Sequence, residues 1–252
     1  MEDKQKNNFP NIIFGFNKDW ELKNWHDSCL KNVTYDPLGK QKWDLGGIPR
    51  EVEEIIEKDE TEEIIKEKIK DIFDQFVKTS KASHITQDIT ERAKKRWDEV
   101  GQKCFFALSK ILDIPIGEFE QNYYAYFTFG RRCPFYENKF MFNQFSDFPN
   151  TASHEIMHIE FLKKYKQYCL NKKLTETQIQ NLKEILTVLL NEDLVDYLYL
   201  TDRGYDSHKQ IRKEVLKLYK EHKKTGENFI VFLDKIIYLL KDKWEYLTSN
   251  KK

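Results

Sequence analysis

Apolar residues recur every three or four positions through most of this chain of 252 residues, and this period constrains the fold more than any other feature. After Pro49 the pattern predicts a short helix followed by a longer one that continues to about Phe76. A second long helix is predicted from about Thr86 to Leu112, with one continuous apolar stripe. The chain is therefore expected to be mostly helical.

One stretch departs from this period. Residues 121–129 and 139–145 are short, aromatic and free of glycine and proline, which is typical of strands. We expect them to pair antiparallel, with a further partner strand near the N-terminus. Residues 1–48 show little periodicity and are expected to form loops with short elements. The predicted fold class is α+β, predominantly helical, with a small antiparallel sheet.

The second half of the chain returns to the helical pattern. Asn150 suits a helix N-cap, and the residues from there to Lys252 are predicted to be helical, with breaks near Lys172, Arg203–Gly204 and Gly226. We expect an N-terminal lobe at 1–146 that carries the sheet and a helical C-terminal lobe at 147–252. The two lobes are expected to form one compact unit with a cleft between them.

Composition excludes several classes of protein. Lysine and arginine together number 42, as do aspartate and glutamate, so the net charge is zero, unlike that of a protein whose main role is to neutralise nucleic-acid phosphates. No run approaches the ~18 apolar residues of a membrane span, and the first residues lack a secretory signal. The four cysteines are widely spaced, which favours reduced thiols. We expect a cytoplasmic protein that binds neither nucleic acid nor membrane.

The strongest functional signal is the H-E-x-x-H motif that runs from His154 to His158. On a helix, residues four apart lie on one face, so both imidazoles can reach one metal ion. Zinc accepts two such nitrogens, needs a third protein ligand and keeps a fourth position for water. Glu155 projects beside that position, where its carboxylate can take a proton. The motif predicts a site for one Zn²⁺ ion with Glu155 as general base.

A candidate third ligand lies in the acidic segment 191–196, on a helix that is predicted to be buried nearly all round. At about 100° per residue, Glu192 and Asp196 fall on the same side of that helix. Two buried carboxylates need partners. A zinc ion for Glu192 and a ligating imidazole for Asp196 would supply them. The alternative is an ordinary salt bridge, for instance to Arg131 or Arg132.

The two motifs together resemble the gluzincins, the thermolysin-like group of zinc metallopeptidases, in which H-E-x-x-H is followed on a later helix by N-E-x-x-x-D. The gap between the motifs is longer here than in thermolysin, which indicates an insertion or an extra helix. The resemblance implies a zincin-like fold with the sheet beside the metal-binding helix. It also implies His154, His158 and Glu192 as zinc ligands, Glu155 as general base, and Asp196 as the carboxylate that holds a ligating histidine.

Peptide hydrolysis also needs a hydrogen-bond donor for the oxyanion that develops on the substrate carbonyl. Tyr205 and His208 follow the Glu192 segment and are candidates for this donor; the alternative is that both lie in a solvent-facing turn between helices. In zincin folds the strand before the metal helix pairs with extended substrate. By this analogy, Asn143 is a candidate substrate-binding residue.

The sequence therefore predicts a zinc metallopeptidase that acts on peptide or protein substrates through a metal-activated water. Two alternatives stay open. One is a zinc hydrolase of a non-peptide amide, and the other is a catalytically inactive helical binding protein. The oligomeric state is left open.

Overall fold

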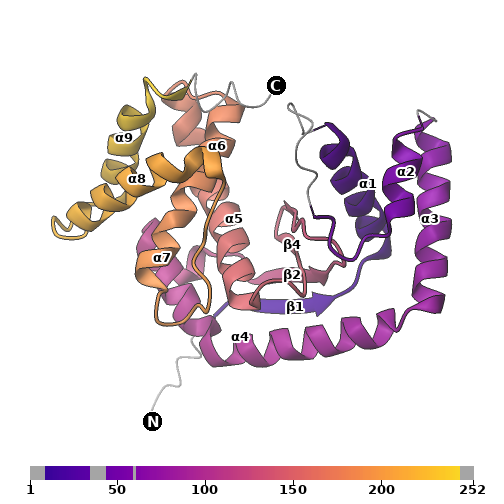
Figure 1. Cartoon of the computed structure of the whole chain (residues 1–252). Helices are drawn as coiled ribbons and strands as arrows, with labels where there is room; N and C mark the ends of the chain where they lie inside the picture. The colour runs from indigo at the N-terminus through magenta and orange to yellow at the C-terminus, as the bar shows by residue number, and fades with distance from the viewer. Residues whose placement is uncertain (1–8, 35–43, 59–60, 245–252) are drawn as a thin grey trace, which may run out of the picture. The chain divides into compact units, whose positions relative to one another are not determined.

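Residues 9–34, 44–58 and 61–244 are described by the computed structural model, and Figure 1 traces the chain. Within these ranges the chain forms two compact units. Unit 1 contains residues 9–11, 98–122 and 149–244, and unit 2 contains residues 12–97 and 123–148. Residues 98–122 therefore group with the C-terminal helices, although they lie within the predicted N-terminal lobe. The cleft expected between lobes 1–146 and 147–252 stays a prediction.

The described sheet is mixed, and the predicted antiparallel pairing is wrong. Its order is β1 (Asn11–Gly15), β2 (Asn122–Phe127), β4 (Lys139–Phe142) and β3 (Phe135–Tyr136). The two predicted strands, β2 and β4, run parallel, with Tyr124 opposite Lys139. The physical reason is the short strand β3 between them, which reverses at Glu137, where φ is +52°, and pairs antiparallel with β4. Because the chain reverses twice, β4 regains the direction of β2. The expected N-terminal partner strand is confirmed as β1.

A helix that the sequence analysis did not predict occupies part of the first 48 residues. This helix, α1 (Lys18–Thr34), packs against α2 (Arg50–Ile56) and α3 (Glu62–Thr79) within unit 2, as Figure 1 shows. The buried face of α1 includes Glu21 and Asn24 beside Trp25 and Cys29. With polar side chains on its inner face, α1 has no apolar stripe for periodicity to detect. α2 and α3 match the predicted short and long helices.

The longest described helix is α4 (Ala82–Leu112), which matches the second predicted long helix and contributes residues to both units. Its predicted stripe is buried throughout, from Ile89 and Ala93 through Trp97 to Leu108 and Ile111. Burial of this stripe explains why α4 is stable as a helix, because most helical stability in proteins comes from packing of the apolar face.

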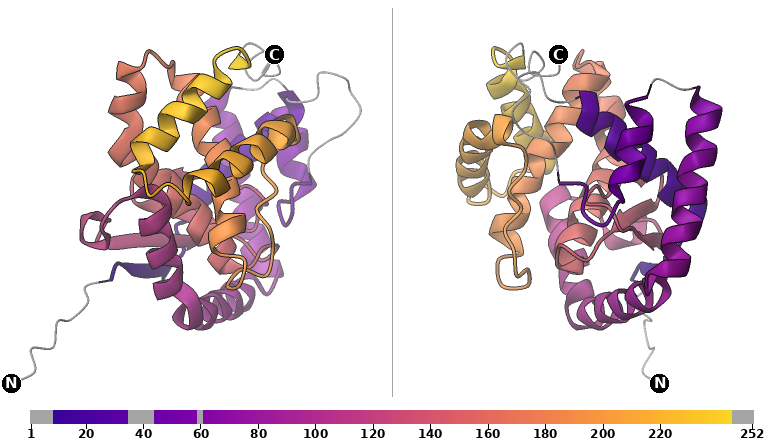
Figure 2. Two further views of the ribbon diagram at one scale, coloured as in Figure 1. Left: turned by 90° about the vertical axis from the view of Figure 1, so that its left-hand side faces the viewer. Right: turned by 45° about the vertical axis from the view of Figure 1, so that its right-hand side comes forward.

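Unit 1 is built from helices, and Figure 2 shows α8 and α9 lying against each other within it. Tyr219 and Phe232 form part of that contact, with ring centroids 5.3 Å apart. Among the described residues, no helix is both long enough and apolar enough to cross a membrane. Besides α4, the helices of this unit are η1 (Ile116–Glu118), α5 (Phe148–Asn171), α6 (Glu176–Leu186), η2 (Thr187–Leu189), α7 (Leu190–Asp193), η3 (Asp206–His208), α8 (Lys209–His222) and α9 (Phe229–Leu240).

The boundaries of α5 and α6 have clear local causes. α5 begins at Phe148, so Asn150 lies in its first turn and is not the N-cap that the sequence predicted. α5 ends at Asn171, and Lys173 follows with a φ of +66°, which confirms the predicted break. Thr175 then caps α6 in a capping box with Gln178. The reversal brings the end of α6 back to α5.

Candidate metal centre

Helix α5 holds both motif histidines on one face. Pro149 suits the first turn, because a helix offers no partner to the N–H groups there. His154 and His158 follow one turn apart, and their ring centroids are separated by 4.3 Å. His158 is buried, whereas His154 keeps a partly exposed side chain. The prediction that the helix places both imidazoles together is confirmed.

The last turns of α6 bring a carboxylate to these imidazoles. Glu184 Oε1 lies 3.3 Å from His158 Nε2, and Glu184 Oε2 lies 3.6 Å from His154 Nε2. Within the described residues, these three side chains form a group whose ligand atoms all lie within 4.8 Å of one another. Such a group can hold a metal ion.

The donor set fits zinc. With bonds of about 2.1 Å and tetrahedral angles, neighbouring ligand atoms of a zinc site lie about 3.4 Å apart. The two histidine–carboxylate separations, 3.3 and 3.6 Å, lie near that value and end on different oxygens of Glu184. Both are longer than the usual N–H···O hydrogen bond of about 2.9 Å. Two imidazoles and one carboxylate are also a known ligand set of catalytic zinc, which leaves a fourth position open.

A second carboxylate fixes the orientation of His154. Asp202 Oδ2 lies 2.5 Å from His154 Nδ1, so Nε2 is the nitrogen that remains for a metal. Asp202 is itself held by three side chains. The Thr187 hydroxyl donates to Oδ1 at 2.8 Å, and the Arg212 guanidinium donates to the same oxygen. The Asn191 side chain binds both the N–H and the C=O of Asp202, at 2.7 and 2.8 Å.

The carboxylates beside the two imidazoles attract a cation, which can be a proton or a metal ion. Burial lowers the pKa of His154, but the Asp202 carboxylate outweighs burial and raises that pKa well above its ordinary value. Burial and the nearby charge of His154 lower the pKa of His158 to about 3, so its nitrogen lone pair is available to a metal. Burial opposes ionisation of Glu184, but the two histidines and Lys183 hold its pKa below the ordinary value.

Glu155 lies between the two histidines in sequence and is buried. Burial raises its pKa to about 7, in spite of the opposing charge of His154. A carboxylate in this range both accepts and releases a proton readily near neutral pH, as a general base and acid must. The environment of Glu155 therefore suits the role that the motif predicts for it.

The structure brings Glu184, and not Glu192, to the histidines. The helix predicted through 185–199 is broken, because the chain tightens into η2, continues as α7 and leaves helical geometry at Leu194. A constant step of 100° per residue therefore does not apply. Glu192 forms an ion pair with Lys220 at 2.9 Å, and Asp196 is exposed. Asp202 takes the place beside a histidine that was predicted for Asp196.

The two predicted oxyanion donors, Tyr205 and His208, lie in the segment after Asp202. Tyr205 is 46% exposed, with its ring edge-on to His208. His208 is buried, and its Nε2 lies 3.0 Å from the side-chain oxygen of Asn181. The predicted role of both side chains as oxyanion donors stays a prediction.

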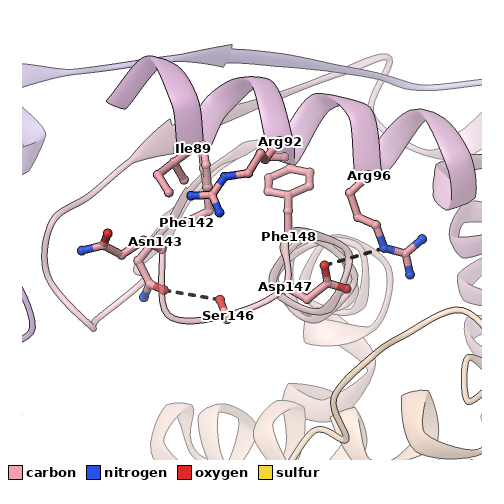
Figure 3. Close-up of a pocket in the computed structure, with 10 residues that line it drawn as sticks. Ile89, Arg92, Arg96, Phe142, Asn143, Ser146, Asp147 and Phe148 are labelled. Carbon is pink, nitrogen blue, oxygen red and sulfur yellow. Dashed lines mark hydrogen bonds and ion pairs between the residues drawn. The ribbon is translucent and has the colours of Figure 1, made fainter. Parts of the chain in front are cut away.

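Asn143, the predicted substrate-binding residue, belongs to unit 2. It lines a pocket of about 230 Å³ between α4 and the end of β4, shown in Figure 3. Its amide group donates to the carbonyl of Arg131 at 2.9 Å, and its oxygen accepts from the N–H of Phe145 at 2.9 Å. These bonds fix the loop after β4. β4 lies between β2 and β3 in the sheet. Because β3 pairs with Phe140, that part of β4 is not a free edge.

Periodicity did not indicate Lys183, Glu184 and Asp202 as site residues. The first two are adjacent charged residues directly between apolar Leu182 and the apolar pair Ile185–Leu186, and charged residues in such a setting are a usable signal. Asp202 lies in a loop between helices, where no period predicts the direction of a side chain.

Comparison with known proteins adds no assignment. No protein-family model matches the sequence, no curated protein matches it, and no solved structure matches the fold.

Proposed function

We propose that this protein is a zinc-dependent metallopeptidase, and that His154, His158 and Glu184 are its metal ligands. The observation that carries the proposal is the convergence of these three side chains on one point. The H-E-x-x-H half of the sequence resemblance to the gluzincins supports the same class of reaction. A zinc ion in this position would act as a Lewis acid that polarises a carbonyl group and acidifies a water molecule.

The residues of the chain then have separate tasks. Glu155 accepts a proton from the attacking water and passes it to the amine that leaves when the C–N bond breaks. Asp202 accepts a hydrogen bond from His154 Nδ1–H, which fixes the tautomer and keeps Nε2 directed at the ligand position. Arg212 and Thr187 hold Asp202 in turn.

The ligand set is tested by a matched pair of substitutions. Glu184→Gln and Glu192→Gln make the same chemical change, eight positions apart, on a proposed ligand and on a residue that forms an ion pair with Lys220. After reconstitution with zinc and removal of excess metal, we expect about one equivalent of zinc in the wild type and in Glu192→Gln, and loss of binding in Glu184→Gln. Retention of zinc by Glu184→Gln and its loss by Glu192→Gln would restore the ligand set predicted from the sequence.

The reaction is tested separately with a peptide-library digest analysed by mass spectrometry. Glu155→Gln should bind zinc like the wild type and cleave nothing. A zinc-loaded wild type that leaves all peptides intact would favour hydrolysis of a non-peptide amide. Failure to bind zinc at all would favour the metal-free binding protein.

A further inference from the structure

A buried lysine lies against the metal centre, and neither the motif nor the reaction above uses it. Lys183 is on α6, and its side chain is only 6% exposed. Its Nζ lies 2.5 Å from Glu184 Oε1, the same oxygen that lies 3.3 Å from His158 Nε2. The ammonium group therefore adjoins the space that a bound ion and its substrate would share.

Burial of an ammonium group is unfavourable unless anionic groups surround it. Glu184 is one such group. The positive charge of Lys183 also opposes the rise in the pKa of Glu155. A lysine side chain is long and flexible enough to extend its ammonium group into water, and surface lysines usually do so. Lys183 instead brings a fixed positive charge to the reacting region.

Other cationic and polar donors near the centre are engaged. The Arg212 guanidinium donates to the Glu184 carbonyl, to the Thr187 hydroxyl and to Asp202. His208 pairs with Asn181. The Lys183 ammonium, in contrast, contacts the side-chain carboxylate of Glu184, a proposed metal ligand.

We propose that Lys183 stabilises the oxyanion of the tetrahedral intermediate, an inference that rests on the proposed hydrolase function. As the water oxygen bonds to the carbonyl carbon, the π electrons of the C=O bond move onto the carbonyl oxygen, and the water proton goes to Glu155. Lys183 stays protonated and donates a hydrogen bond to the new negative oxygen. When the C–N bond breaks, the carbonyl reforms and this interaction weakens. Preorganised donors of this kind typically contribute about 10²–10³ in rate.

The test uses two small ligands of the cobalt-substituted protein, followed by the visible spectrum of Co²⁺. Inorganic phosphate is a tetrahedral oxyanion, whereas imidazole is neutral and reports only that the open metal position is accessible. For Lys183→Met we expect phosphate to bind at least ~10-fold more weakly and imidazole to bind as in the wild type. Lys183→Arg, which keeps the charge, should retain most of the phosphate affinity. Lys166→Met is the matched control, because Lys166 lies on α5 in a surface ion pair with Glu176.

Each other outcome overturns the inference in a recognisable way. Unchanged phosphate binding in Lys183→Met removes Lys183 from the oxyanion site. Equal weakening of both ligands shows that the lysine only maintains the structure. A wild type that binds Co²⁺ but not phosphate refutes this inference and leaves the metal centre intact, whereas a wild type that binds no Co²⁺ refutes the metal centre as well. If Lys183→Met does not fold, Lys183→Gln compared with Lys183→Arg makes the same distinction between a neutral and a charged donor.

Discussion

Glu21 lies in the interior of unit 2, and nothing in the sequence indicated its burial. Ionisation of its side chain makes the stability of the protein depend on pH. Its side chain on α1 is fully buried. One carboxylate oxygen accepts hydrogen bonds from the Trp25 indole at 2.6 Å and from the N–H of Phe129 at 3.0 Å. Burial raises the pKa of Glu21 from 4.5 to about 7, although these hydrogen bonds oppose the change.

The sign of the effect follows from linkage. The folded protein holds the proton of Glu21 more tightly than the unfolded chain does, so folding is favoured most when the group is protonated in both states. This contribution is fully present below pH 4.5 and is lost as the pH rises through about 7. One pKa unit corresponds to about 1.4 kcal/mol, so the contribution falls by about 2.5 kcal/mol between pH 5 and pH 8. That loss is a large fraction of a typical net stability of 5–15 kcal/mol.

Glu21→Gln removes the ionisation and keeps a side-chain oxygen for Trp25 and Phe129. We expect the variant to lose this part of the pH dependence, whatever happens to its stability at a single pH. The assay is urea unfolding at several values between pH 5 and pH 8, with EDTA present so that metal binding does not contribute. The measured quantity is the difference in unfolding free energy between variant and wild type, because titration of all other groups then cancels to a first approximation.

An exposed residue of the same unit supplies the control. Glu63→Gln on α3 changes the same functional group at the surface, and its difference from the wild type should stay within about 0.5 kcal/mol at every pH. If the difference between Glu21→Gln and the wild type is the same at pH 5 and pH 8, Glu21 does not titrate in this range and the reasoning from burial is refuted.

Three further outcomes test the metal centre. Asp202→Asn should weaken zinc affinity by about 10–100-fold, as loss of a carboxylate behind a ligating histidine usually does, and Asp196→Asn should leave it unchanged; the reverse result in a zinc-competition titration would contradict the geometry. Gly204→Ala should lower the unfolding free energy by about 1–3 kcal/mol in thermal or urea unfolding, since Gly204 has a φ of +61° and a Cβ there would lie 2.7 Å from the Arg212 guanidinium; an unchanged stability would show that the loop can rearrange freely. For wild type held at free zinc 100 times its Kd, EDTA should lower the unfolding free energy by about 2.7 kcal/mol, and it should leave His158→Ala unaffected. Equal losses for the two proteins in calorimetry would indicate a zinc site elsewhere.

The sequence was informative where one physical cause dominates local structure. The stripe of α4 is regular because one face of a long helix is buried, and the period alone predicts it. The helix α1 escaped prediction for the opposite reason, since buried Glu21 and Asn24 interrupt its apolar face. For the sheet, composition predicted the two strands but not their parallel pairing. Direction depends on β3, two residues long, which is too short to leave a pattern.

The candidate site shows the same limit at the level of single side chains. The two histidines are held four residues apart on one continuous helix, so their proximity follows from helical geometry alone. The third candidate ligand, a carboxylate, depends on where a second helix lies and where it ends. The prediction of Glu192 assumed an unbroken helix through 185–199, but the helical geometry tightens at η2 and α7 ends at Asp193.

The segment 191–196 nevertheless contributes to the site through a different residue. Asn191 binds both backbone groups of Asp202, and this clamp sets the position of the carboxylate that orients His154. A carboxylate beside a motif histidine was expected from Asp196, and the loop instead supplies it from Asp202, a residue that periodicity cannot reach. Chemistry fixes which groups a metal site requires, and helix ends and loops decide which residues provide them. For this chain, the spacing of a motif constrains ligands within one helix, and ligands from other elements have to be read from the fold.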